Sequence, residues 1–275
     1  MTFFCHYIVI SFTKPIVKGD TMKFKKIHNI WLVGLLSVWM VGCSSSSDNS
    51  STSDDTNESS VIAVTKSEKD LVPNFLYLDD QDLVVLAKDS VEGAILAEDF
   101  KGRVNKAYEF DGVSNAIEIP HNDKFNIQDK ITLSAWVYTS EKRSAVIIRK
   151  GPEVNGDTHA PYELAISATG DAIFSLNLPL DDDDNRTWVQ VRSGYSDKSW
   201  FHIVGTYDGT SMKLYINGDL VNAKDATGKM NTNQSPLLIG TRLKLPSSTW
   251  KGKIADVRIY TRALSSDEID KLYNQ

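Results

Sequence analysis

The sequence predicts an all-β protein, in which two antiparallel sheets stack face to face as a sandwich and a short helix follows at the C-terminus. From about residue 83 onward, short strand-like segments alternate with turn residues, a spacing typical of sandwiches. Residues 131–138 alternate apolar and polar side chains, which indicates a strand with one face in a core. The core side of that strand should carry Ile131, Leu133, Ala135 and Val137.

A β-hairpin is predicted where residues 211–216 and 220–221 flank Asn217 and Gly218. Asn-Gly suits the tight primed turn between two strands, because both residues tolerate positive φ. The other strands that we expect are residues 84–87, 107–110, 116–119, 145–149, 162–168, 172–178, 187–191, 200–207, 236–239 and 253–260.

One helix is expected at the C-terminus. Ser265 and Glu268 stand at the spacing of a capping box, in which each side chain bonds the other residue's backbone amide. Leu264 and Ile269 occupy the positions of a hydrophobic staple around that cap. We expect a short helix that lies against the sandwich.

The N-terminal region predicts export. Lys23, Lys25 and Lys26 precede an apolar run at residues 30–41, which is too short for a membrane core that needs about 20 residues. Residues 22–42 are therefore interpreted as a signal peptide. Met22 places its lysines directly before the apolar run, so residues 1–21 are interpreted as a start-site overcall.

Met40-Val41-Gly42-Cys43 resembles the lipobox of bacterial lipoproteins, with Met40 in place of the usual leucine. The resemblance implies cleavage before Cys43 and acylation of its thiol and new amino group, so the protein would be lipid-anchored in the cell envelope. Ser44 is not the aspartate that retains lipoproteins in the inner membrane, which implies the outer membrane if the source is Gram-negative.

Residues 43–60 are rich in serine and aspartate and should form a disordered tether. Residues 61–82 are left as an unassigned N-terminal extension, with a candidate strand at 61–64.

Charge and cysteine content exclude some classes of function. The chain carries a formal net charge of −6, and removing the five lysines and one aspartate of its first 42 residues makes the balance −10. A nucleic-acid partner is not expected, because it would need clustered cations. The two cysteines are Cys5 and Cys43, and the lipid would occupy Cys43, so the sandwich should be stable without a disulfide.

Several segments together resemble the laminin-G-like jelly-roll domains of the concanavalin A-like lectin/glucanase superfamily. Their order is Ala-Tyr-Glu-Phe-Asp-Gly at 107–112, Ile-Thr-Leu-Ser-Ala-Trp-Val at 131–137, Trp-Phe-His-Ile-Val-Gly-Thr-Tyr-Asp-Gly at 200–209, Leu-Tyr-Ile-Asn-Gly at 214–218 and Trp-Lys-Gly-Lys-Ile-Ala-Asp-Val-Arg-Ile-Tyr at 250–260. The resemblance implies that residues 83–275 form a carbohydrate- or protein-binding module.

Members of this family often hold a calcium ion through oxygen ligands, and the resemblance implies Asp89, Asp111 and Asp256 as candidates. An alternative stays open, in which Asp111 only forms a turn with Gly112 and Asp256 is a surface strand residue. The acidic run at residues 181–184 is interpreted as a solvated loop.

A sugar site would pair an aromatic face with polar side chains. The best cluster in the sequence contains Trp188, Tyr195, Arg186 and Arg192, and Trp250 is a second candidate. Trp136 and Trp200 match family positions and are expected in the core. Trp188 alternates only weakly with Gln190, which favours a core position for it as well.

No catalytic residues are predicted. Glycosidases need two carboxylates, and the strings Glu-x-Asp-x-Glu and Glu-x-Asp-x-x-Glu of the laminarinase-type relatives do not occur. Glu163 has no carboxylate at alternate positions of its strand. The sequence thus favours a lipid-anchored module that binds a polysaccharide, with calcium assistance as part of the hypothesis. The alternatives are a protein-binding adhesin or assembly module, and a divergent glycan-cleaving enzyme.

Overall fold

A computed structural model describes residues 62–63, 75–79, 82–86, 88–151, 160–179, 186–242 and 248–275. The predictions for residues 1–60, which include the signal peptide, Cys43 and the tether, lie outside these residues, and so does the acidic run at 181–184. No helix in the described ranges is long and apolar enough to cross a membrane.

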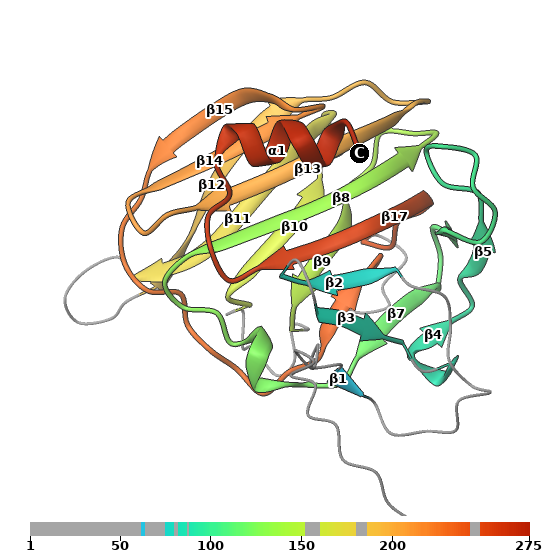
Figure 1. The fold of residues 1–275 in the computed structure, drawn as a ribbon, viewed down its shortest axis with the longest axis horizontal. Helices are drawn as coiled ribbons and strands as arrows, with labels where there is room; N and C mark the ends of the chain where they lie inside the picture. Colours follow the sequence, from blue (N-terminus) through green and yellow to red (C-terminus); the bar gives the residue numbers. More distant parts are fainter. Residues whose placement is uncertain are drawn as a thin grey trace, which may run out of the picture. The chain divides into compact units, whose positions relative to one another are not determined.

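Two sheets form the sandwich, as predicted (Figure 1). The ten-stranded sheet contains β1 (Ile62–Ala63), β2 (Leu76–Leu78), β3 (Asp82–Val85), β5 (Ile95–Ala97), β6 (Ala107–Asp111), β8 (Ile131–Thr139), β13 (Trp200–Tyr207), β14 (Ser211–Ile216), β15 (Asp219–Asp225) and β17 (Lys251–Tyr260). The seven-stranded sheet contains β4 (Val91–Glu92), β7 (Ala116–Ile119), β9 (Ala145–Lys150), β10 (Tyr162–Ile166), β11 (Asp171–Pro179), β12 (Arg186–Gly194) and β16 (Leu237–Ile239). Its strand order is β12-β11-β10-β9-β16-β7-β4.

The main hydrophobic core lies between the sheets. The four residues of β8 that were expected there, Ile131, Leu133, Ala135 and Val137, belong to it. Leu164, Phe174 and Val191 reach it from the seven-stranded sheet. Contact between the sheets is so close at Gly205 of β13 that a Cβ atom there would lie 2.3 Å from Cγ of Phe174. The absence of a side chain at Gly205 therefore makes room for the Phe174 ring.

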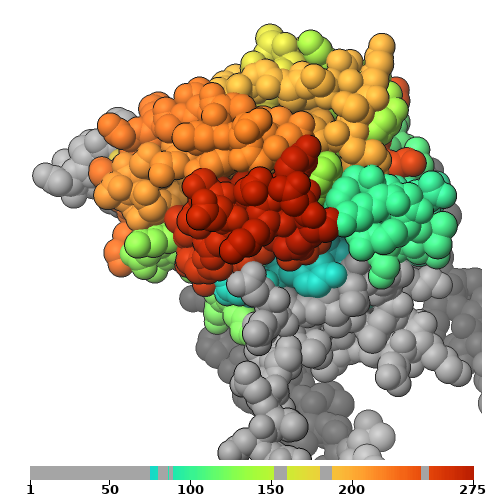
Figure 2. Space-filling view, turned by 45° about the horizontal axis from the view of Figure 1, so that its top comes forward, coloured from blue at the N-terminus to red at the C-terminus, as the bar shows by residue number. Residues whose placement is uncertain are grey.

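The other face of the ten-stranded sheet is covered by α1 (Ser266–Tyr273), which lies at the surface in red (Figure 2). Its capping box is confirmed, with Ser265 and Glu268 each bonding the other's backbone amide. Leu264, Ile269 and Leu272 form a second buried cluster with β13, β14 and β17. Trp136 of β8 is stacked on Phe100 at 3.9 Å and on Tyr273 at 5.5 Å between ring centroids.

The predicted hairpin is present between β14 and β15, with φ of 53° at Asn217 and 87° at Gly218. The described residues of the N-terminal extension 61–82 also contribute to the ten-stranded sheet, and β1 lies within the candidate strand at 61–64. β2 pairs in parallel with β17, and Phe75, Leu76 and Leu78 are buried in the core. The sandwich therefore includes residues before 83. Two short 3-10 turns, η2 (Lys88–Ser90) and η3 (Asp123–Phe125), complete the described elements.

Candidate functional site

The outward face of the seven-stranded sheet carries polar side chains that are buried. Strand register places Arg149, Glu163, Ser175 and Gln190 opposite one another, in one row across β9, β10, β11 and β12. Their neighbours along each strand, such as Leu164, point into the core. Arg149, Glu163 and Ser175 are each no more than 3% exposed. We call these four residues the polar row.

Two further rows flank the polar row. On one side, Asn177 of β11 pairs with Trp188 of β12. On the other side, Val146, Ala165, Ile173 and Arg192 lie opposite one another. The outward face thus offers one aromatic ring, a polar row and an apolar patch with an arginine at its end.

Glu163 is held by two guanidinium groups. Nη1 of Arg149 donates to Oε2 of Glu163, and Nη2 of Arg242, which follows β16, lies 2.9 and 3.1 Å from the two carboxylate oxygens. Nε of Arg149 donates to the carbonyl of Gly151 at 2.8 Å. The guanidinium carbon of Arg149 also lies 5.3 Å from the centroid of the Trp188 ring. Charge pairing and ring contact together fix this buried arginine in place.

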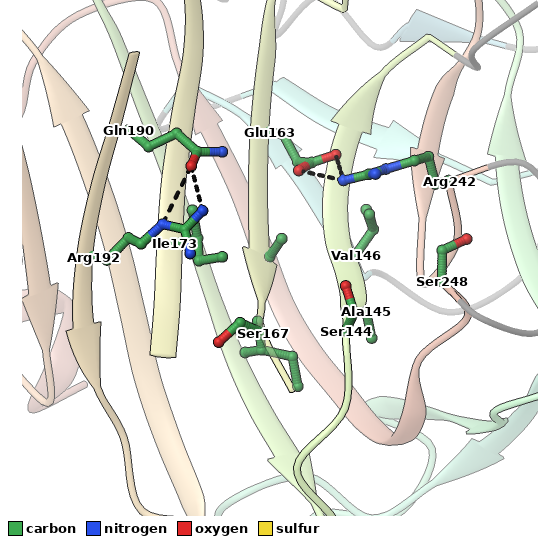
Figure 3. A pocket seen from close by; sticks show the side chains of 12 residues that line it. Ser144, Ala145, Val146, Glu163, Ser167, Ile173, Gln190, Arg192, Arg242 and Ser248 are labelled. Carbon is green, nitrogen blue, oxygen red and sulfur yellow. Dashed lines mark hydrogen bonds and ion pairs between the residues drawn. The ribbon is translucent and has the colours of Figure 1, made fainter. Parts of the chain in front are cut away.

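A cavity of about 210 Å³ opens beside Glu163 (Figure 3). Gln190 and Arg192 line one side of it, while Glu163 and Arg242 line the other. Nε of Arg192 donates to Oε1 of Gln190 at 3.2 Å, and Nε2 of Gln190 donates to Oγ of Ser175 at 3.1 Å. Val146, Ala165 and Ile173 add apolar lining, and hydroxyl groups come from Ser144, Ser167 and Ser248. The lining is thus more polar than the mostly apolar walls of a typical small-molecule site, which suits a ligand rich in hydroxyl groups.

Two of the predicted sugar ligands lie on this face. Trp188 is partly exposed, and its register opposite Asn177 places it away from the core. The core position that the weak alternation favoured for Trp188 is therefore wrong. Arg192 is exposed and lines the cavity. Arg186 begins β12, and its side chain lies outside the described part of the structure.

The other two predicted sugar ligands are in the core. Trp250 is 0% exposed, so its ring cannot stack on a sugar. Tyr195 is buried and stacked on Phe201 at 4.9 Å, and burial raises the pKa of its hydroxyl to about 12. Tyr195 does help to line a second, wider cavity of about 610 Å³, together with Asp171, Asn217 and others. Trp136 is buried as expected, although beneath α1 and not between the sheets, whereas Trp200 is partly exposed and the core position expected for it is wrong.

The three predicted calcium ligands do not converge. Asp111 pairs opposite Lys251 of β17, and Asp256 lies five residues further along that strand, about 16 Å away at ~3.3 Å per residue. The Asp111 carboxylate accepts hydrogen bonds from the backbone amides of Val113, Ser114 and Asn115 in its own turn. Burial alone would raise the pKa of this carboxyl, but the hydrogen bonds outweigh it and lower the pKa.

Asp256 pairs with Arg258, whose Nε lies 3.1 Å from each carboxylate oxygen. Asp89 is exposed in η2. Among the described residues, no three His, Cys, Asp or Glu side chains group as a metal site would require. Asp89, Asp111 and Asp256 thus do not fit one calcium site, because turn amides and Arg258 already occupy two of the carboxylates.

Sequence reasoning missed Arg149, Asn177, Gln190 and Arg242 as site residues, and it weighed Glu163 only as a catalytic group. A signal was present, since Arg149 and Glu163 are charged residues in strands that are mostly apolar. Charged side chains are almost never fully buried unless they are paired. Two opposite charges on successive apolar strands therefore predict a buried ion pair.

The chain belongs to the Concanavalin A-like lectin/glucanases superfamily, because the Laminin_G_3 family model matches residues 111–270, more than half of its length. Among curated proteins no match was found.

Solved structures share the fold at low sequence identity. The binding domain of Paraclostridial Mosquitocidal Protein 1 is 16% identical with a TM-score of 0.53, over 75% of this chain and 52% of that one. The botulinum neurotoxin serotype D binding domain is 18% identical with a TM-score of 0.52, over 73% of this chain and 50% of that one. This chain thus spans about half the length of these toxin domains.

Domain 4 of AbnA, an extracellular arabinanase of Geobacillus stearothermophilus solved with arabinotriose, is 18% identical with a TM-score of 0.50, over 66% of this chain and 82% of that one.

Proposed function

We propose that this protein is a carbohydrate-binding module whose ligand lies on the outward face of the seven-stranded sheet, across the polar row and against Trp188. The observation that carries the proposal is the cavity beside Glu163, which combines an apolar patch with fixed amide, guanidinium and hydroxyl groups. Sugars present the same combination, since apolar C–H faces alternate with hydroxyl groups that both donate and accept. At about 210 Å³ the cavity is smaller than the ~300–1,000 Å³ of drug-sized sites, so it suits one unit of a longer glycan.

The family and the shared fold support this proposal. The superfamily includes lectins, and the arabinanase domain with the same fold was solved with arabinotriose. The likeness to these domains concerns the fold, and the ligand is inferred from the residues on the outward face.

Binding without cleavage is favoured by the arrangement of carboxylates. Glu163 is paired with two guanidinium groups and buried. The nearest other glutamate on this face of the described strands is Glu118 of β7, which pairs opposite Leu238, and Leu238 pairs opposite Arg149. Its Cα is thus three strands from that of Glu163, about 14 Å at ~4.8 Å per strand. Glycosidases hold their two carboxyl groups about 5–10 Å apart.

Binding of the full-length protein to a panel of plant, bacterial and animal polysaccharides tests the proposal, with Trp188→Ala as the variant. Trp200→Ala is the matched control, because Trp200 is a partly exposed tryptophan of β13 in the other sheet. We expect wild type and Trp200→Ala to bind one glycan class and Trp188→Ala to lose about 1–2 kcal/mol, the usual size of an aromatic contact. Absence of binding to every polysaccharide would overturn the proposal and favour a protein partner.

We also propose that the module is anchored in the envelope by lipid on Cys43, as the resemblance of residues 40–43 to a lipobox implies. Several acyl chains would hold it firmly at a membrane surface. Labelling with radioactive palmitate in cells should mark the wild-type protein and leave Cys43→Ser unlabelled. Equal labelling of both proteins would exclude Cys43 as the lipidated residue.

A further inference from the structure

The cavity on the outward face is rich in arginine. Three guanidinium groups, from Arg149, Arg192 and Arg242, lie at or beside it, and the polar row provides one carboxylate, that of Glu163. The hydrogen-bond partner of Arg192 is the neutral amide of Gln190. A protein with a formal net charge of −6 thus concentrates positive charge at this cavity.

Among the described residues, the other charges near the cavity do not remove this excess. Asp171 lies at the start of β11, where it accepts hydrogen bonds from Ser167 and Thr169, and its pKa is lowered mainly by these bonds and further by Arg192 and Lys142. Asp171 therefore adds one negative charge, and Lys142 adds one positive charge beside it. Glu118 lies two strands from Arg149, toward the opposite edge of the sheet.

Two guanidinium nitrogens near Glu163 are buried without a hydrogen-bond acceptor. They are Nη2 of Arg149 and Nε of Arg242. Arg149 is 2% exposed, so water is largely excluded from its unpaired donor. A buried donor without a partner costs about 1–3 kcal/mol, and more when it is charged. Of the two residues, Arg242 lines the cavity, so a ligand there can supply an acceptor for its guanidinium group.

We propose that the glycan recognised here is acidic, with a carboxylate on a sugar unit that sits between Arg192 and Arg242. This inference rests on the proposed function and names the class of sugar that the same site selects. Arg192 and Arg242 line opposite sides of the cavity, and each is accessible, Arg192 by its exposure and Arg242 with 35% of its side chain exposed (Figure 3). Guanidinium groups form paired hydrogen bonds with planar carboxylates, which a neutral hydroxyl cannot match.

Polygalacturonate and its fully methyl-esterified form test this proposal, because they share one backbone and differ in the free carboxylate. Affinity of the full-length protein for both polymers would be measured for wild type, Arg192→Gln and Arg242→Gln. Lys106→Gln is the charge-matched control, since Lys106 is exposed next to β6 of the other sheet. Dextran sulfate reports attraction to negative charge of any kind. Circular dichroism and melting temperature confirm that each variant is folded.

We expect tight binding of polygalacturonate, weak binding of the ester and of dextran sulfate, and a loss of about tenfold or more for each arginine variant. Lys106→Gln should bind as wild type does. Equal affinity for acid and ester, or for polygalacturonate and dextran sulfate, would overturn the acidic-glycan inference. Binding confined to neutral glycans that still depends on Trp188 would overturn it too, while leaving the proposed function intact. No binding to any polysaccharide would overturn both.

Discussion

Glu163→Gln should destabilise the protein because it leaves a guanidinium group buried without its counter-charge. Arg149 keeps a bond to the carbonyl of Gly151 and its contact with the Trp188 ring, but it loses the carboxylate. Arg242 can turn toward water, since 35% of its side chain is exposed. Removal of one partner from a buried ion pair costs about 3–5 kcal/mol, and we expect the lower part of that range here.

Two variants make this prediction specific. The double variant Arg149→Met with Glu163→Leu removes both charges, and such replacements are often neutral within about 1 kcal/mol. Glu141→Gln is the exposed counterpart, because Glu141 also pairs with two cations, Arg143 at 3.1 Å and Lys251 at 3.0 Å, yet has 41% of its side chain exposed. Exposed pairs contribute about 0–1 kcal/mol.

Urea unfolding followed by tryptophan fluorescence measures the free energy of unfolding of all three variants. A loss of less than about 1 kcal/mol for Glu163→Gln would contradict this prediction, and so would an apolar double variant that loses as much as the single variant. Either result would mean that the Arg149 charge does not depend on Glu163 for its stability.

Other predictions concern pH and packing. Burial lowers the pKa of His202 from 6.5 to about 3, so the unfolded state binds the extra proton, and stability should fall by about 2 kcal/mol between pH 7 and pH 5. Thermal melting at both pH values should show a smaller fall for His202→Gln, and an equal fall would contradict the assignment. Burial lowers the pKa of Lys150 from its ordinary value of 10.5 to about 8, so the unfolded state binds more protons between these values. The free energy of unfolding should therefore rise by about 2 kcal/mol from pH 7.5 to 9.5. Urea unfolding across that range should show the rise in wild type, and its persistence in Lys150→Met would exclude Lys150 as the cause. Gly205→Ala should lose about 1–3 kcal/mol in the same assay, because its Cβ would meet the Phe174 ring, whereas an unchanged midpoint would show that the sheets can separate locally.

Local patterns predicted most of the fold. The alternation in β8, the Asn217-Gly218 turn and the capping box of α1 depend on residues adjacent in the sequence, and the structure confirms each. β2 was missed, because a three-residue strand carries too little pattern to be recognised before its partner β17 is known.

The candidate site could be predicted only in part, because β9 and β10 are buried on both faces and show no alternation that separates inward from outward residues. A register shift between β9 and β10 brings Val146 and Arg149 to the same face although they are three residues apart. The predicted calcium ligands could not be tested against one another from the sequence for a similar reason. Whether Asp111 and Asp256 meet depends on the register of β6 against β17, which sequence spacing does not determine.

Mapping of the bound glycan on the protein tests the location of the site most directly. Amide hydrogen exchange of the full-length protein would be compared with and without the polysaccharide that binds best in the panel. We predict added protection in β9, β10, β11 and β12 around Glu163, Gln190 and Trp188, and unchanged exchange in β13, β14 and β15 of the other sheet. Protection confined to the ten-stranded sheet or to α1 would contradict a binding site on the outward face of the seven-stranded sheet.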